Sequence, residues 1–154
     1  MIRITKATDY GILLMSHFAR RTDRVVLNAK DLAGQTRIPL PMVGKILKTL
    51  AHGGLLESHR GARGGYALAR SAEQISLTQV ISAIDGPVSL TECGEGPGVC
   101  SLELLCPIQS NWMRINDALR QALSGVTLAD IARPGHWTAT LSGTSARQTE
   151  KVGV

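Results

Sequence analysis

Aromatic residues are scarce in this sequence of 154 residues, where Phe, Trp and Tyr together make up 3% of the chain. So few rings argue against a large aromatic-lined pocket for a small molecule, and against the stacking surfaces of single-strand-binding proteins. The sequence also has no carboxylate pair, no Ser-His-Asp arrangement and no nucleotide fingerprint, and its four histidines are dispersed. We therefore expect that the protein is not an enzyme and has no small-molecule substrate.

Long hydrophobic runs are also missing. The apolar runs are only a few residues long, whereas a membrane-spanning helix needs about 20. The first residues lack the hydrophobic block and the cleavage site of a secretory signal. We therefore expect a cytoplasmic protein without a membrane partner, in a reducing compartment where three cysteines do not form a disulfide framework.

Positive and negative charges are unevenly divided along the chain. Residues 1–70 contain 12 Lys and Arg residues against 4 Asp and Glu residues, whereas residues 71–154 contain 5 against 8. A basic half joined to a mildly acidic half is typical of a module that binds a polyanion and is attached to a part with another role. Chance clustering on a solvated surface would give the same numbers, so charge alone does not establish the function.

The predicted elements of the first 70 residues follow the order of a winged helix-turn-helix. Apolar periodicity predicts helices over residues 5–21, 28–33 and 41–52, with Thr5 and Asn28 as N-caps. The segments LLESHR, GARGG and YALAR then predict a strand, a glycine-rich turn and a second strand. A small helical bundle with an incidental hairpin is the alternative. A phosphate-binding loop fits poorly, because GARGG lacks a Lys-Ser/Thr ending and a following helix.

The third predicted helix carries the DNA-binding prediction. Its core stripe consists of Val43, Ile46, Leu47 and Leu50. A second face is basic and carries no acidic residue, as expected for a helix that enters the major groove beside a wing in the minor groove. The residues that we expect to contact DNA are Pro41, Met42, Lys45, Lys48 and Thr49 on the helix, and Arg60 and Arg63 near the hairpin tip.

The second half of the chain is expected to supply a dimerisation helix. Helices are predicted over residues 76–85 and 127–132, with a long helix between them that opens at Pro107 and ends before Gly125. Along the long helix, apolar residues step by 4, 3, 4 and 3 and form a heptad seam of Ile108, Trp112, Ile115, Leu119 and Ala122. The seam could pack within its own chain. We expect a homodimer instead, because duplex-reading winged helices commonly bind two half-sites.

All three cysteines lie in a predicted loop over residues 91–107. Cys93, Cys100 and Cys106 lack the close pairing that structural zinc sites use. Thiolates are soft ligands, and long, irregular spacing among glycines favours a loop folded around a larger object, such as an iron–sulfur cluster. Three buried, unreactive cysteines are the alternative, which fits poorly with the glycines and proline of residues 94–98.

Three stretches of the sequence resemble one known family. They are the opening RITKATDYG, the string KILKTLAHGGLLESHRGARGGYALAR and the segment SLTECGEGPGVCSLELLCPIQSNW, in the familial order over about residues 1–132. They are similar to the winged-helix iron–sulfur regulators that include IscR and NsrR, and most similar to the proteobacterial SUF-system regulators. The resemblance implies a homodimer that binds double-stranded operator DNA and holds a 2Fe–2S or 4Fe–4S cluster on the three cysteines.

The sequence departs from IscR at two functional positions. The residue three places after the last cysteine, a histidine ligand in IscR, is here Gln109, and the base-reading glutamate of IscR is here Gly44. Neither the fourth ligand nor the dual-site specificity of IscR is therefore expected. NsrR-like members use an aspartate at the position of Asp9, donated by the opposite subunit, so the resemblance implies Asp9 as the fourth ligand. Arg60 matches the wing arginine that enters the minor groove in the family.

These observations predict a mainly α-helical protein with a small β-hairpin. We expect a winged helix-turn-helix domain over residues 1–70, a cluster loop and dimerisation helix over residues 71–132, and a partly disordered tail over residues 133–154. The predicted function is DNA-binding repression of iron–sulfur assembly genes, controlled by cluster occupancy. The alternative is a nitric-oxide- or redox-sensing repressor on the same scaffold.

Overall fold

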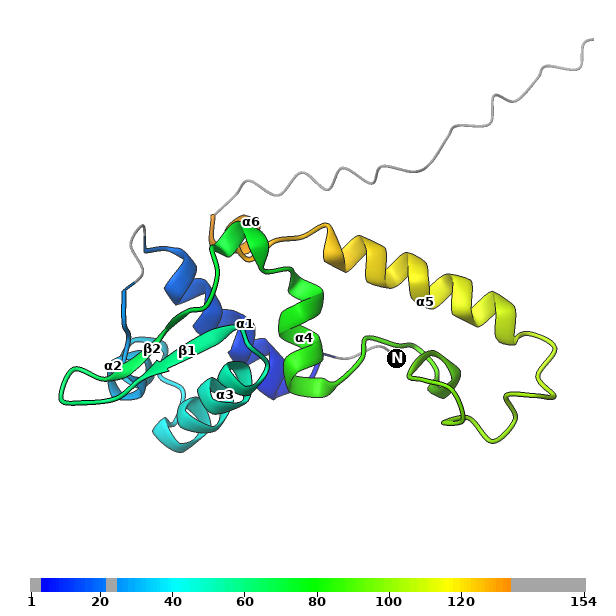
Figure 1. Ribbon diagram of the computed structural model, residues 1–154, viewed down its shortest axis with the longest axis horizontal. Helices are drawn as coiled ribbons and strands as arrows, with labels where there is room; N and C mark the ends of the chain where they lie inside the picture. The colour runs from blue at the N-terminus through cyan, green and yellow to red at the C-terminus, as the bar shows by residue number, and fades with distance from the viewer. Residues whose placement is uncertain (1–3, 22–24, 134–154) are drawn as a thin grey trace, which may run out of the picture.

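The computed structural model describes residues 4–21 and 25–133, so the predicted tail lies outside the described residues except for Arg133. The chain is mainly helical with one two-stranded antiparallel sheet, as predicted (Figure 1). Its elements are, in order, α1 (Lys6–Ala19), α2 (Ala29–Thr36), α3 (Leu40–His52), β1 (Leu56–His59), β2 (Gly65–Leu68), η1 (Ala72–Gln74), α4 (Leu77–Asp85), η2 (Glu92–Gly94), α5 (Gln109–Ser124) and α6 (Leu128–Ala132).

Side-chain caps set where the first helices begin. The Thr5 hydroxyl accepts a hydrogen bond from the Thr8 N–H at the start of α1, and the Asn28 carbonyl oxygen accepts one from the Asp31 N–H at the start of α2. Both predicted N-caps are confirmed. Helix α2 runs beyond the predicted end and closes at Arg37, whose left-handed backbone (φ 59°) turns the chain toward α3.

Helix α3 packs its predicted stripe into the core. Val43, Ile46, Leu47 and Leu50 are all buried, which confirms the predicted stripe. The same core cluster takes in Leu14 of α1, Leu32 of α2 and Leu56 of β1. Burial of this periodic face holds α3 against the other helices and leaves its opposite face toward solvent.

The hairpin forms where the turn signals place it. Its register runs from Leu56 opposite Leu68 to His59 opposite Gly65. Leu27 pairs with Tyr66 through two backbone hydrogen bonds of 2.8 and 2.9 Å, which attach the hairpin to the start of α2. A side chain at Gly65 would collide with the Leu27 carbonyl, so glycine is required for this close approach.

The second half of the chain completes the core of the first. Helix α4 packs on α1 and α3, and α6 returns to α1. Backbone bonds of 2.8 Å from Leu77 N–H to the Val126 carbonyl and from Leu128 N–H to the Ile75 carbonyl join these late elements. Ile75, Val80 and Leu128 belong to the same buried cluster as α3, so the hydrophobic core continues past residue 70.

Helix α5 extends away from this body, and the loop of residues 91–107 lies at its far end (Figure 1). The helix begins at Gln109 with Ile108 as its N-cap, two residues later than the start predicted from Pro107, and ends before Gly125 as predicted. Within residues 4–21 and 25–133, no helix is long and apolar enough to cross a membrane.

Candidate nucleic-acid interface and cysteine loop

The solvent face of α3 presents the residues predicted to contact DNA. Pro41, Met42, Lys45 and Lys48 are exposed. Thr49 is half-buried. Its hydroxyl donates to the Lys45 carbonyl at 3.1 Å, which holds the Thr49 side chain against the backbone of α3. The face therefore offers two lysine ammonium groups beside small and apolar side chains, a surface that can approach phosphates and base edges.

The hairpin tip carries Arg60 and Arg63, both exposed. The turn that carries them is tight, because a side chain at Gly64 would lie 2.5 Å from the His59 carbonyl oxygen. Among the described residues, the one ion pair joins Arg120 to Asp117, so the cations of α3 and the hairpin tip have no carboxylate partner there. Unpaired guanidinium and ammonium groups are suited to neutralise phosphates.

The three cysteines lie on the loop, and all are half-buried and free of disulfides. Cys93 lies in η2, whereas Cys100 and Cys106 lie farther along. Within residues 4–21 and 25–133, no three His, Cys, Asp or Glu side chains lie close enough to hold a metal ion. The single chain thus places the thiols on one loop without gathering them.

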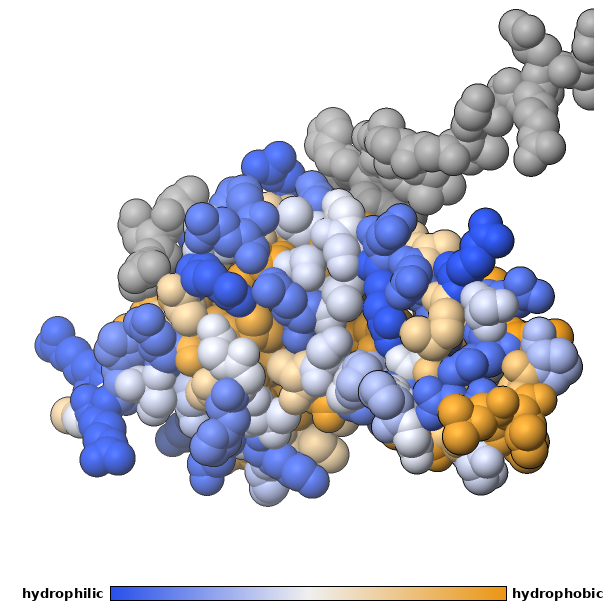
Figure 2. All heavy atoms as spheres, turned by 45° about the vertical axis from the view of Figure 1, so that its right-hand side comes forward, coloured by the Kyte–Doolittle hydropathy of each residue, from blue (hydrophilic) through white to orange (hydrophobic). Residues whose placement is uncertain are grey.

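The two limbs of the loop differ sharply. The first limb, residues 88–94, is fastened to α5: Arg120 Nε donates to the Val88 carbonyl at 2.9 Å, and another Arg120 nitrogen donates to the Gly94 carbonyl. The second limb, residues 95–107, exposes large apolar side chains, with Leu104 98% and Leu105 83% exposed. Figure 2 shows apolar side chains gathered on the molecular surface at this end. Arg120 therefore fastens the Cys93 side of the loop to α5 through two hydrogen bonds, whereas the later part is joined to α5 through the Gln109 side chain, which donates to the Glu103 carboxylate at 3.3 Å.

The apolar seam predicted on α5 faces outward. Ile108 is 50% and Ile115 46% exposed, and Ala122 is exposed, while Trp112 and Leu119 are half-buried. The side of α5 opposite the seam packs on α4 and η2. The seam therefore does not pack fully within its own chain. Its exposed part is an apolar surface that a second copy of the chain could cover.

Asp9 is exposed in the first turn of α1. The end of α1 on which it lies is tied to α4, because the Thr5 and Thr8 hydroxyls donate to the Asp85 carboxylate at 2.6–2.9 Å. Within the described chain, Asp9 is not grouped with the cysteines. Its role as a ligand to a cluster on the opposite subunit stays a prediction.

Three positioning residues were not found from the sequence. Asn116 and Arg120 hold the first limb of the loop, and Asp85 ties α4 to α1. Their partners in these contacts lie 25 to 80 residues away along the chain. The one local signal is that Asn116 and Arg120 are four residues apart and so share a helix face beside the apolar seam.

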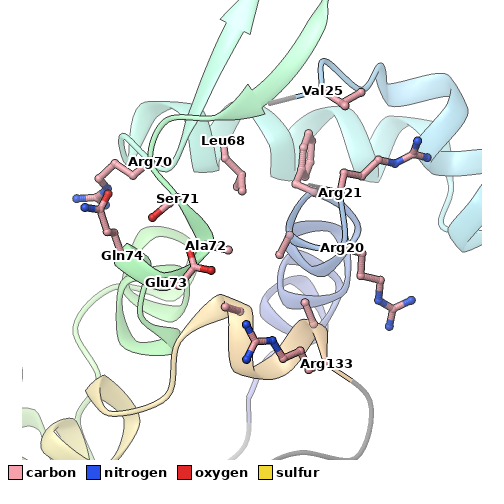
Figure 3. Close-up of a pocket in the computed structure, with 14 residues that line it drawn as sticks. Arg20, Arg21, Val25, Leu68, Arg70, Ser71, Ala72, Glu73, Gln74 and Arg133 are labelled. Atoms are coloured by element: carbon pink, nitrogen blue, oxygen red, sulfur yellow. The ribbon is translucent and has the colours of Figure 1, made fainter. Parts of the chain in front are cut away.

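A hollow of about 790 Å³ lies elsewhere, where α1, β2, η1 and α6 meet (Figure 3). Arg20, Arg21, Arg70 and Arg133 are among its lining residues, with Glu73 as the acidic one. Burial, followed by the positive charges of Arg20 and Arg21, lowers the pKa of the nearby His17. The lining includes none of the predicted DNA or cluster residues.

A helix-turn-helix whose second helix presents lysines, followed by a two-stranded wing with arginines at its tip, is the architecture of winged helix-turn-helix DNA-binding proteins. The chain belongs to the Rrf2 family, described as iron-dependent transcriptional regulators, whose model matches residues 4–134. It is a DNA-binding transcription regulator and not an enzyme.

Named relatives agree with this assignment. The chain is 30% identical to the transcriptional regulator IscR of Cronobacter sakazakii, over 84% of this chain and 80% of the relative. It is 28% identical to the transcriptional regulator CymR of Bacillus subtilis, over 85% and 90%. The solved structure of CymR, the global cysteine regulator of B. subtilis, aligns with a TM-score of 0.67 at 26% identity, over 86% of this chain and 97% of that one.

Proposed function

We propose that this protein is a homodimeric repressor of iron–sulfur assembly genes, similar to SUF-system regulators, that responds to the cluster on its loop. The observation that carries the proposal is the set of three free thiols on one loop, fastened to the helix that bears the apolar seam. The chain belongs to a family of iron-dependent regulators, and thiols are soft ligands. Three thiols next to the expected dimer contact therefore support the proposal of a metal-responsive dimer.

The donor set fits iron in chemistry, since thiolates are the usual ligands of iron–sulfur clusters. Cys93, Cys100 and Cys106 would hold the cluster, either 2Fe–2S or 4Fe–4S, which when bound supplies a redox- and iron-responsive centre. Gln109 is a poor fourth ligand, because the neutral oxygen of a carboxamide is a weaker donor to iron than a thiolate or an imidazole. The fourth position is thus left to a residue such as Asp9 from the opposite subunit.

The chain's own contacts supply a route from the loop to the DNA. Arg120 and Asn116 fix the Cys93 limb to α5, and α5 packs on α4, which packs on α1 and α3. Gathering Cys100 and Cys106 toward Cys93 would order the second limb next to the start of α5. A change there alters how two α5 helices meet, and with it the separation of the two wings.

Anaerobic purification tests the proposal directly. We expect bound iron and sulfide with absorption and Mössbauer spectra of an iron–sulfur cluster, and an operator affinity that differs between the loaded and the cluster-free dimer. A protein that takes up no iron or sulfide, or binds operator equally well in both forms, would refute cluster-controlled repression.

Nitric-oxide or redox sensing is the second candidate, favoured by the weak donor Gln109 at the position of the IscR histidine ligand. A site without a strong fourth ligand is open to nitric oxide and oxygen. Operator affinity of the loaded dimer would be measured after separate exposure to nitric oxide, peroxide and iron limitation. Loss of operator binding after exposure to nitric oxide or peroxide, with iron in full supply, would favour this candidate over a regulator that senses iron–sulfur cluster supply.

The DNA contacts give the first mutational prediction. Operator binding, to a pseudo-palindrome with half-sites about one helical turn apart, should weaken steeply with salt. Arg60→Ala should cost about 1–3 kcal/mol of binding free energy and change the A·T preference, whereas Lys48→Ala should weaken binding more uniformly and reduce the salt slope by about 1. Fluorescence anisotropy over a salt series measures both effects.

Arg114→Ala is the matched control, because Arg114 is an exposed cation on α5. It should leave operator affinity unchanged. If Arg60→Ala and Lys48→Ala behave like this control, α3 and the hairpin tip are not the DNA-contacting surface.

The fourth ligand gives the second prediction. Asp9→Ala should leave the fold and the dimer intact but change the cluster spectrum or speed cluster loss, because it removes a carboxylate that lies exposed in the single chain. Asp31→Ala, an exposed first-turn carboxylate on α2, is the control. A spectrum and lifetime equal to those of the wild type would assign the fourth position to Gln109, water or an external thiol.

A further inference from the structure

Asn116 is the one buried residue of α5, and its side chain is fully shielded from solvent. A buried carboxamide is stable only when its polar atoms have partners. Here the Asn116 carbonyl oxygen accepts from the Leu90 N–H at 2.8 Å. Because a backbone N–H can only donate, this contact fixes the orientation of the amide and directs its nitrogen to the other side.

On that other side lies Thr91. The Asn116 side-chain nitrogen donates to the Thr91 hydroxyl oxygen at 3.3 Å, and the same hydroxyl lies 3.1 Å from the Cys93 sulfur. A hydroxyl has one hydrogen and two lone pairs. Since Asn116 occupies a lone pair, the hydrogen is left for the sulfur. A cysteine that serves as a thiolate ligand carries no hydrogen, so in that state the Thr91 hydroxyl is the donor.

The backbone around this contact is fixed as well. The Ser89 hydroxyl donates to the Thr91 carbonyl at 2.6 Å and accepts from the Thr91 N–H at 3.3 Å. A side chain at Gly94 would collide with the Asn116 amide and the Ser89 hydroxyl. The lack of a side chain at Gly94 therefore lets the loop approach α5 closely enough for the hydrogen bonds to form.

We propose that Thr91 is a positioning residue for Cys93, oriented by Asn116, so that a hydrogen-bond relay runs from the dimer helix α5 to the first ligand sulfur. The inference rests on the proposed function, because it assigns the sulfur to a cluster. A hydrogen bond to a ligand sulfur stabilises negative charge and raises the reduction potential of the cluster. The relay thus makes the potential of the centre depend on the position of α5.

The test compares two changes at Thr91 in the full chain, reconstituted anaerobically with iron and sulfide. Thr91→Val keeps the shape and removes the hydroxyl, whereas Thr91→Ser keeps the donor. We expect Thr91→Val to lower the reduction potential and to speed cluster loss roughly ten- to a hundredfold, the usual effect of losing a ligand's outer partner. Thr91→Ser should keep both values near those of the wild type.

Thr78→Val is the matched control, since the Thr78 hydroxyl contacts Ser124 at 3.1 Å on the α4–α5 contact but touches no sulfur. It should leave the potential and lifetime unchanged. An unchanged potential and lifetime in Thr91→Val, or equal changes in Thr91→Val and Thr91→Ser, would overturn the relay.

A cluster-free measurement separates this inference from the proposed function. In metal-free protein, Thr91→Val leaves the buried Asn116 donor without its acceptor, so amide hydrogen exchange over residues 88–94 should become roughly tenfold faster, while Thr91→Ser stays slow. Equal exchange rates in wild type and Thr91→Val would overturn the relay. The wild-type protein could hold no cluster while Thr91→Val still exchanges faster than the wild type. That result would refute the proposed function but support the Asn116–Thr91 contact.

Discussion

Replacing Ile115 by aspartate should turn the proposed homodimer into monomers and reduce operator affinity roughly a thousandfold or more, to the level of non-specific binding. Ile115 lies on the seam of α5 and is 46% exposed in the single chain, so the change should leave the winged body folded. Pairing two seams would bury the new carboxylate without a partner, at a cost of about 3–5 kcal/mol per charge. Analytical ultracentrifugation and operator titration measure the two effects.

Gln121→Asp is the control for this experiment. Gln121 is exposed on α5 away from the seam, and the substitution adds the same charge to the same helix. It should remain dimeric and bind operator normally. An Ile115→Asp protein that stays dimeric would mean that the homodimer does not form through this seam.

Replacing Cys93, Cys100 or Cys106 singly by alanine should abolish stable cluster binding. Three thiols already leave one coordination position to another donor, and loss of a further ligand leaves two thiols, too few to retain a cluster. Each variant should contain no bound iron or sulfide, and its visible absorption spectrum should lack the bands of a cluster. All three thiols are half-buried and free in the structure, so alanine should be accommodated without unfolding.

Ser101→Ala provides a control within the same loop, at an exposed position next to Cys100. It should bind the same amount of iron and sulfide as the wild type. If any single cysteine variant also retains the full content, that cysteine is not a ligand. If all three do, the loop is not the site of the cluster.

Local patterns predicted the helices and the hairpin well. Thr5 and Asn28 cap the helices that they were expected to cap, and the apolar stripe of α3 is buried. These features depend on residues three or four apart, where backbone geometry alone sets which side chains share a face. The start of α5 was predicted two residues early, because a proline that suits a first turn can also lie just before the cap.

The candidate site could be predicted only in part. The sequence placed three cysteines in one predicted loop, and it identified the exposed cations of α3 and the hairpin. It did not indicate that Asn116 and Arg120 hold the Cys93 limb to α5, or that the second limb leaves Leu104 and Leu105 exposed. A periodic pattern reveals which residues face inward, but it does not reveal what they meet there.

By itself, the sequence determined the order of the main helices and strands, the core stripe of α3, its basic face and the place of the three cysteines between α4 and α5. Only the tertiary structure decided that α6 returns to α1, that Asp85 binds the threonines at the start of α1, and that Asn116 reaches Thr91 beside Cys93. The first group depends on local backbone geometry and residue chemistry. The second depends on contacts between residues far apart in the chain, which form only when the helices pack together and bury their shared core.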